Sequence, residues 1–241
     1  MGEESTVVIP SFIDQVIQFD DGVSYELLKP LTTYRQCHDG TPPEARMVFT
    51  CKQMGEGDVA LQEYIMKIKI RVPHREHEDR NDGAEVESSN TTRAEVEALT
   101  KFREANTSFA PQLVNYKRAV QGSDGPFPNG YKTFTVMTKM PGDSLHDLYF
   151  WGMPEEERGK IAQAFLVALR SMYALGIEPV DCALRNVLWE RKTERCTIID
   201  FEIWRESDGN VEDEIKELQR WGLARRPAAK NHWEAWNEQW R

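Results

Sequence analysis

The segment from residue 176 to residue 202 constrains the fold of this chain more than any other. It reads GIEPVDCALRNVLWERKTERCTIIDFE. Two apolar runs, 187–189 and 197–199, are separated by the polar stretch 191–195. An apolar run, a polar turn and a second apolar run are typical of a β-hairpin. The sequence therefore predicts two antiparallel strands here, with their outer ends close together.

Three polar side chains flank the predicted hairpin. Asp181 and Asn186 precede its first strand, and Asp200 follows its second strand. Because a hairpin returns the chain to its starting point, we expect Asp200 to lie beside the loop that carries the other two. Hard cations such as Mg²⁺ prefer oxygen ligands. The pattern predicts two oxygen ligands and one base that converge on one spot; a solvated asparagine with two unrelated acids is the alternative.

Asp181 and Asn186 form the motif D-x-x-x-x-N, and Asp200 opens the tripeptide Asp-Phe-Glu. With the hairpin between them, these motifs resemble the catalytic loop and metal-binding strand of the protein-kinase-like superfamily, where H-R-D-x-x-x-x-N precedes D-F-G. The His-Arg pair is absent here, and Glu202 replaces the glycine. The Asp-Phe-Glu ending is more similar to choline-kinase and aminoglycoside-kinase relatives. The resemblance implies a two-lobed α+β fold of the protein-kinase-like type.

The apolar stretch 64–70 predicts a strand, which resembles the small-lobe strand that carries the phosphate-binding lysine of kinases. Lys67 and Lys69 share one face of this strand, because strand side chains alternate with a period of two. The resemblance implies that one of them, with Lys67 the first choice, holds the α- and β-phosphates of ATP. The alternative is that both are solvated lysines on an exposed sheet face.

Residues 92–99 predict the start of a helix, because apolar residues follow at helical spacing. The segment resembles the small-lobe helix whose glutamate pairs with the strand lysine, and Glu95 fits this role best. A second interpretation stays open. Thr92 followed three residues later by Glu95 also matches a capping box, in which the carboxylate binds a backbone N–H. Glu97 or no residue would then pair with the lysine.

Residues 134–145 read as a β-branched strand ended by Pro-Gly. They resemble the strand and hinge that join the two lobes, and this resemblance places Met137 and Met140 beside the adenine of a bound nucleotide. A long helix is predicted from about residue 154 to residue 175. Proline opens it, three glutamates lie in its first turn and apolar residues recur at helical spacing. The apolar face of this helix is expected in a core.

Three features depart from the kinase pattern. The segment 32–45, where a glycine-rich loop is expected, contains no G-x-G-x-x-G, although glycines let backbone N–H groups approach phosphates closely. Ala183 replaces the catalytic-loop lysine, and Arg185 is the nearest cation. No A-P-E motif follows Glu202, so the platform that grips a peptide substrate is not expected. We therefore expect a truncated helical large lobe without an activation segment, and not a typical protein kinase.

The first functional hypothesis is phosphotransfer from Mg-ATP to a small molecule. On this hypothesis the resemblance assigns Asp181 to the acceptor hydroxyl, and Asn186 and Asp200 to Mg²⁺. Arg185 would be the catalytic cation of the loop, and Lys67 would bind phosphate oxygens. Catalysis would rest on positioning and charge neutralisation.

The second hypothesis keeps the fold and changes the chemistry. The stretches ALTKF, MTKMPG, DCALRNVLWE and IIDFE resemble small kinase-like proteins of filamentous fungi. This resemblance includes the fungal arginine-containing cyclodipeptide synthases of secondary metabolism, which use aminoacyl-tRNA as a substrate. It implies that Asp181, Asp200 and Glu202 recognise a guanidinium or an amine, and transfer protons in a pocket that does not need ATP. Cys182 would line the same pocket.

The third hypothesis is a non-catalytic pseudokinase or assembly subunit. Trp233, Trp236 and Trp240 are spaced three and four residues apart, which places them along one helical face. Such a stripe either docks on the core or contacts a partner protein. The intact acids around the predicted hairpin argue against this hypothesis, because a scaffold has no chemical need for them.

Length and composition bound the organisation of the chain. It has 241 residues, of which 40% are hydrophobic, enough for a core. We expect a small lobe at 10–139 with a flexible, charge-rich loop at 73–90, a hinge at 140–145 and a reduced large lobe at 146–241.

Charge and hydropathy limit the partners. The formal net charge of −10 argues against extensive phosphate-backbone binding. A local basic patch could still contact tRNA, and its residues are Arg220, Arg225, Arg226 and Lys230. No run of 18 apolar residues occurs, and the first ten residues lack an apolar core, so neither a membrane span nor a signal peptide is expected. The four cysteines show no C-x-x-C spacing, which suits a reduced, cytoplasmic compartment.

Overall fold

The computed structural model describes residues 12, 15–33, 35–37, 43–55, 62–73 and 87–225. The chain divides into two compact units. The first comprises Met1–Val96 and Leu113–Lys139, and the second comprises Glu97–Gln112 and Met140–Arg241. Helices and an antiparallel sheet occur together in the chain, which confirms the predicted α+β class.

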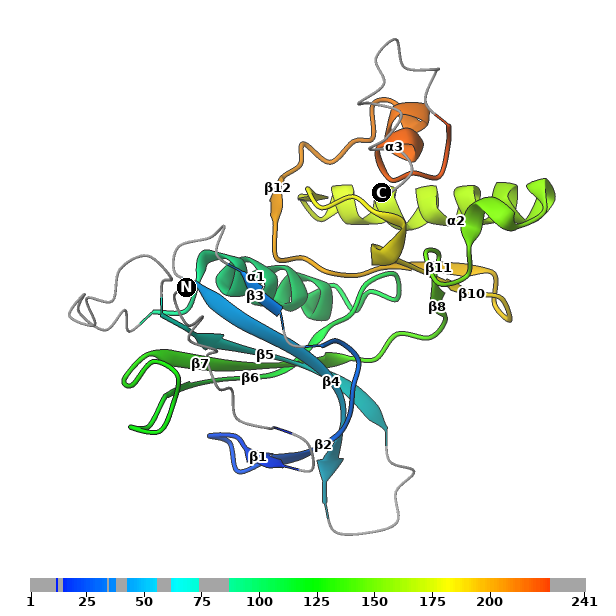
Figure 1. Ribbon diagram of the computed structural model, residues 1–241. Helices are drawn as coiled ribbons and strands as arrows, with labels where there is room; N and C mark the ends of the chain where they lie inside the picture. The colour runs from blue at the N-terminus through cyan, green and yellow to red at the C-terminus, as the bar shows by residue number, and fades with distance from the viewer. Residues whose placement is uncertain are drawn as a thin grey trace, which may run out of the picture. The chain divides into compact units, whose positions relative to one another are not determined.

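The first unit is built on an antiparallel sheet (Figure 1). Its strands pair in the order β1-β2-β4-β5-β7-β6, and β3 pairs with β4 outside this path. Their bounds are β1 Val16–Gln18, β2 Ser24–Pro30, β3 Arg35–Cys37, β4 Glu44–Met54, β5 Glu63–Arg71, β6 Leu113–Val120 and β7 Tyr131–Thr138. The sheet is curled so that its ends approach each other. Asn115 Nδ2 donates to Asp21 Oδ2 at 2.8 Å, and Lys117 Nζ donates to the Gln18 carbonyl at 2.6 Å.

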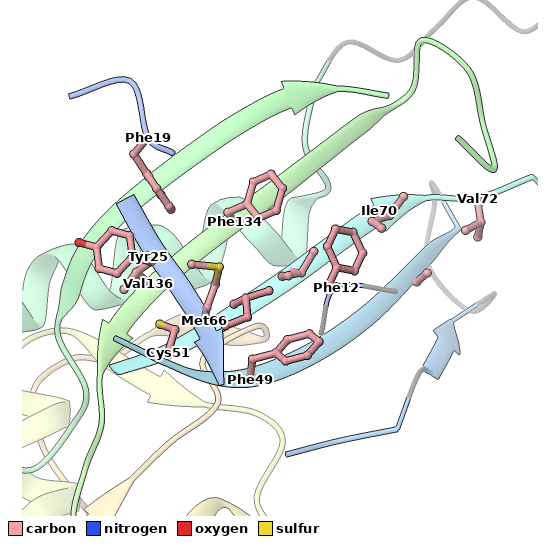
Figure 2. Packing of buried hydrophobic residues seen from close by; sticks show 13 residues of the cluster. Phe12, Phe19, Tyr25, Phe49, Cys51, Met66, Ile70, Val72, Phe134 and Val136 are labelled. Carbon is pink, nitrogen blue, oxygen red and sulfur yellow. The ribbon is translucent and has the colours of Figure 1, made fainter. Parts of the chain in front are cut away.

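The side chains of strand β5 alternate between an apolar face and a polar face of this sheet. Met66 and Ile68 belong to the buried apolar cluster, whereas Lys67 and Lys69 point to the other face, as alternation along a strand requires. The predicted strand at 64–70 is thus confirmed. Figure 2 shows the cluster, whose members are Phe12, Phe19, Tyr25, Leu27, Ala45, Phe49, Cys51, Met66, Ile68, Ile70, Val72, Phe134 and Val136. Because burying one large apolar side chain stabilises by about 1.5–3 kcal/mol, this cluster contributes strongly to the stability of the unit.

Helix α1, Asn90–Glu104, begins slightly earlier than the sequence predicted. The Ser89 hydroxyl accepts a hydrogen bond from the Thr92 N–H at 3.2 Å, so serine takes the capping role. Thr92 therefore lies inside the first turn. The capping box that the sequence allowed for Thr92 and Glu95 is not formed.

A buried polar cluster lies on the polar face of the sheet. Glu44, Lys69 and Tyr131 are all almost fully buried. The Tyr131 hydroxyl donates to Glu44 Oε1 at 2.7 Å, and Lys69 Nζ donates to Thr91 Oγ1 at 3.0 Å. Burial and the nearby Glu44 charge raise the pKa of Tyr131 far above its ordinary value, so the hydroxyl stays a donor.

Replacing Tyr131 with Phe should lower the free energy of unfolding by about 1–3 kcal/mol, because the buried Glu44 carboxylate loses a hydrogen-bond donor. Urea denaturation of the variant and the wild-type protein measures the difference. Tyr149→Phe is the control, since the Tyr149 side chain is exposed and its loss should change stability by less than about 0.5 kcal/mol. Equal losses in the two variants would contradict the importance of the Glu44 bond.

The second unit combines a long helix with two small sheets (Figure 1). Besides the part of α1 from Glu97 onward, its helices are α2 Glu155–Ala174, α3 Glu214–Arg220 and the short 3₁₀ helices η1 Phe150–Gly152 and η2 Leu184–Asn186. Its strands are β8 Asp143–Ser144, β9 Ile177–Pro179, β10 Val187–Glu190, β11 Arg195–Ile198 and β12 Trp204–Glu206. The predicted long helix is confirmed as α2, with Pro154 as its N-cap residue. Its apolar face is buried against β9, β11 and α3 through Ile161, Phe165, Leu169 and Met172.

Strands β10 and β11 form the predicted hairpin. Val187 pairs with Ile198, and strand β8 pairs with the other edge of β10. Gly142 precedes β8 with a φ of +98°, and a Cβ atom there would lie 2.6 Å from the carbonyl carbon of Trp189. Glycine is required at this position by the backbone conformation and by the close approach. This requirement explains the Pro-Gly that ends the preceding strand in the sequence.

Among the described residues, no helix has the length and apolar character that a membrane crossing would need.

Candidate functional site

The backbone of the second unit brings the predicted site segments together. Strand β9 runs directly into the loop that carries Asp181, and β9 pairs with β12, which follows the segment that begins at Asp200. The Ile199 N–H also donates to the Asn186 carbonyl at 2.9 Å. The loop from Asp181 to Asn186 is therefore tied to the segment around Asp200 at both of its ends.

Inside this loop the side chains of Asp181 and Asn186 hold each other. Asn186 Nδ2 donates to the Asp181 carbonyl at 2.9 Å and to Asp181 Oδ2 at 3.3 Å. Because Asn186 is buried and its amide nitrogen is engaged, its side-chain oxygen is the atom that can bind a cation. The D-x-x-x-x-N spacing thus fixes the orientation of both residues.

Arg185 covers the carboxylate of Asp181. Its Nη2 atom lies 2.8 Å from Asp181 Oδ1 and 2.7 Å from Asp181 Oδ2. About half of each of these two side chains is exposed to solvent, so water screens the pair and its contribution to stability is small. The contact shows that this carboxylate accepts a guanidinium group, and that a substrate group would have to share Asp181 with Arg185 or displace it.

Asp200 and Glu202 place two carboxylates close together. A carboxylate oxygen of Asp200 lies within 4.8 Å of one from Glu202. Two negative oxygens at this separation repel each other and attract a divalent cation. Asn186 lies on the loop whose backbone is hydrogen-bonded to this segment, and its side chain offers a further oxygen of the kind that Mg²⁺ prefers. Asp200 also has a φ of +69°, a left-handed conformation that Asp and Asn adopt more readily than most residues.

Cys182 follows Asp181 but is not a reactive thiol. Its Sγ atom donates to the Pro179 carbonyl at 3.4 Å. Burial raises the pKa of the thiol to about 12, and the nearby Arg220 only partly opposes this effect. The thiol therefore keeps its proton at neutral pH, when only a thiolate is a strong nucleophile.

Beneath the loop, Glu178 of β9 is held by two arginines that the sequence did not single out for this role. Arg205 Nε donates to Glu178 Oε2 at 2.7 Å, and Arg220 Nη1 donates to Glu178 Oε1 at 2.7 Å. The hydrogen bonds from Arg205, followed by those from Arg220, lower the pKa of Glu178 despite its burial. Arg220, which the sequence offered as part of an RNA-binding patch, is thus engaged within the unit.

Glu178 should make the protein sensitive to acid. A carboxyl group whose pKa is lower in the folded state stabilises the fold above its unfolded pKa, which is about 4.3, and this stability is lost as the pH falls through the folded pKa. The wild-type protein should therefore lose stability below about pH 4.3 more steeply than Glu178→Gln, whose side chain does not titrate. Urea denaturation between pH 3 and pH 7 measures the two slopes. Parallel curves would contradict this prediction.

In the first unit, Lys67 and Glu95 form a buried ion pair. Lys67 Nζ lies 2.5 Å from Glu95 Oε1, and both side chains are largely shielded from solvent. Glu97, the alternative partner for the lysine, instead pairs with Lys101 on the helix surface. Lys69 is buried beside Thr91 and lies 3.9 Å from Glu44. Lys67, the first choice of the two strand lysines, thus pairs with Glu95.

The two methionines predicted near a nucleotide lie on either side of the boundary between the units. Met137 is buried on β7, where it pairs with Ile65 of β5 and Leu113 of β6. Met140 begins the second unit and is partly buried. Their role beside an adenine stays a prediction.

Several predicted features fall wholly or partly outside the described residues. These are the first ten residues, most of the loop at 73–90, and the tryptophans Trp233, Trp236 and Trp240. Within the segment 32–45, where the resemblance places a loop between two strands, β3 pairs with β4, with Arg35 opposite Arg46. Residues 38–42 between these strands lie outside the described residues.

Comparisons with known proteins yield similarities to solved structures. No protein-family model matches the sequence, and no curated protein matches it. The chain is similar to the PK-1 kinase of the Cydia pomonella granulovirus, with a TM-score of 0.48 and 20% sequence identity. The similarity covers 76% of this chain and 55% of the viral kinase, so the chain spans about half the length of that protein.

Proposed function

We propose that this chain is a divergent kinase-fold enzyme that transfers a phosphoryl group from Mg-ATP to a small molecule. The observation that carries the proposal is the loop from Asp181 to Asn186, whose backbone is bound to the segment that presents Asp200. Phosphotransferases with the D-x-x-x-x-N motif use its acid for the acceptor hydroxyl, and its asparagine with the following aspartate for the metal.

Four residues of the second unit would act in this reaction. Asp181 orients the acceptor hydroxyl and takes its proton as the new bond from oxygen to the γ-phosphorus forms. The bond between the γ-phosphorus and its bridging oxygen breaks, and ADP leaves with the bonding electrons. Asn186 and Asp200 would hold Mg²⁺, which neutralises phosphate charge when it is bound. Arg185 would leave Asp181 and stabilise the transferred group, where the kinase pattern has a lysine.

In the first unit, Lys67 would bind the α- and β-phosphates. The ion pair with Glu95 supports this assignment, because kinases hold the phosphate-binding lysine with a glutamate from the following helix. Met137 and Met140 would lie beside the adenine. The segment 32–45 has no G-x-G-x-x-G motif, so fewer backbone N–H groups would reach the phosphates.

A small acceptor is favoured over a peptide. After Glu202 the described residues form only the short strand β12 and the seven-residue helix α3. Neither provides the extended platform on which protein kinases bind a peptide. The substrate would therefore be a small molecule with a hydroxyl group.

Thermal denaturation with and without Mg-ATP tests nucleotide binding directly. Ligand at a hundred times its dissociation constant should stabilise the folded state by about 2.7 kcal/mol. ATP without a divalent cation, and Mg²⁺ without ATP, should give smaller shifts. Incubation with γ-³²P-ATP and pools of small hydroxyl compounds then tests transfer. No stabilisation by Mg-ATP would overturn the proposal.

A second function is favoured by the contact between Arg185 and Asp181. This carboxylate already binds a guanidinium group, so its chemistry suits the arginine side chain of a substrate. On this alternative the chain is an aminoacyl-tRNA-dependent cyclodipeptide synthase, in which Asp181, Asp200 and Glu202 bind the substrate and move protons. Mass spectrometry after incubation with arginyl-tRNA would detect arginine-containing cyclodipeptides. Their absence, together with stabilisation by Mg-ATP, would exclude it.

A further inference from the structure

Arg220 on α3 joins several elements beneath the loop that carries Asp181. One of its terminal nitrogens, Nη2, donates to the Pro179 carbonyl, and the other lies 2.7 Å from Glu178 Oε1. The same Nη1 atom lies 3.3 Å from the Tyr173 hydroxyl of α2 and 3.1 Å from Glu217 Oε1. One guanidinium group therefore connects α2, α3 and the last two residues of β9.

The contact of Arg220 with the Pro179 carbonyl lies next to the loop that carries Asp181. Pro179 is the last residue of β9, and Asp181 follows it at the second position. The Pro179 carbonyl accepts hydrogen bonds from Arg220 and from the Cys182 thiol, so its orientation is held on both sides. A rotation of this peptide would move the backbone that carries Asp181.

Arg205 provides a natural comparison. It also binds Glu178, but from the exposed side of β12, and its side chain is 68% exposed. The hydrogen bonds described for Arg205 go to Glu178 alone and none goes to Pro179. The two arginines therefore share one acidic partner and differ in the contact with the loop.

We propose that Arg220 is a positioning residue, which fixes the Pro179 carbonyl and thereby sets the place of Asp181 for the reaction. The proposal rests on the proposed phosphotransfer for its catalytic consequence, whereas its structural part concerns the loop alone. A lysine cannot replace the arginine here, because a single ammonium group does not reproduce the planar fork that meets a carbonyl and a carboxylate together.

Two matched variants test the structural part. Arg220→Lys and Arg205→Lys each keep the positive charge and each alter a contact with Glu178. Hydrogen exchange followed by mass spectrometry is measured on the peptide that spans 180–186. We expect exchange about tenfold faster in Arg220→Lys, because the loop opens more often, and exchange close to the wild-type rate in Arg205→Lys. Equal exchange in all three proteins would overturn the proposal.

The catalytic part is tested with the same proteins and the wild-type acceptor. We expect Arg220→Lys to lower kcat by about tenfold or more, since small displacements of a catalytic group are costly, with the KM for ATP changed by less than about twofold. A rise in KM for ATP with unchanged kcat would overturn the positioning role. If the wild-type protein transfers no phosphoryl group, the proposed function fails, and hydrogen exchange still decides whether Arg220 holds the loop.

Discussion

Replacing Asp200 with Asn is expected to lower Mg-ATP-dependent phosphoryl transfer by about a thousandfold. The amide lacks the negative charge that binds a divalent cation, and metal ions supply several kcal/mol of transition-state stabilisation, where each 1.36 kcal/mol is a factor of ten in rate. Asn is the suitable replacement because it tolerates the left-handed backbone of this position, at a φ of +69°. The measurement is kcat at saturating ATP over a series of Mg²⁺ concentrations.

Two results would distinguish a lost metal ligand from a general disturbance. Asp208→Asn is the control, because the Asp208 carboxylate only accepts a hydrogen bond from the nearby Asn210 N–H, and this variant should keep its activity. Circular dichroism of Asp200→Asn at the assay temperature should show a folded protein, so that a loss of transfer cannot be attributed to unfolding. An active Asp200→Asn variant with unchanged Mg²⁺ dependence would contradict the metal role.

Much of this fold could be predicted because its signals are local. The hairpin of β10 and β11 follows from two apolar runs around a polar turn, and α2 follows from its proline, its acidic first turn and its apolar spacing. Strand β5 was equally clear from its alternation. In each case residues near one another in the sequence decide the structure, and tertiary packing agrees with them.

The contacts that complete the candidate site could not be predicted in the same way. Arg220 of α3 donates a hydrogen bond to the carbonyl of Pro179 on β9. The sequence around a charged residue on a short helix does not indicate which distant carbonyl its side chain will bind. The start of α1 was misplaced for a related reason: Ser89 and Thr92 are both good capping residues, and the packing of the helix decides between them. The pairing of Lys67 with Glu95 was proposed only by resemblance, since periodicity cannot tell an ion pair from a cap.

Replacing Lys67 with Met is expected to destabilise the protein by about 3–5 kcal/mol, because it breaks a buried ion pair by removing the ammonium group that lies 2.5 Å from Glu95 Oε1. The reverse change, Glu95→Gln, should also destabilise, since the buried ammonium group loses its negative partner. Urea denaturation measures both losses. Glu97→Gln is the matched control on the same helix: its pair with Lys101 is exposed, and its removal should cost no more than about 1 kcal/mol.

The double variant Lys67→Met/Glu95→Gln separates stability from function. If the two side chains act as a pair, the double variant should be more stable than the sum of the single losses implies, by about 0.5–3 kcal/mol. It should nevertheless bind Mg-ATP no better than Lys67→Met, because both variants lack the lysine assigned to the α- and β-phosphates. If the ion pair served the fold alone, the double variant would bind Mg-ATP better than Lys67→Met does, because its stability is partly restored. Measuring unfolding and ATP affinity on the same four proteins therefore decides whether Lys67 serves the fold, the nucleotide or both.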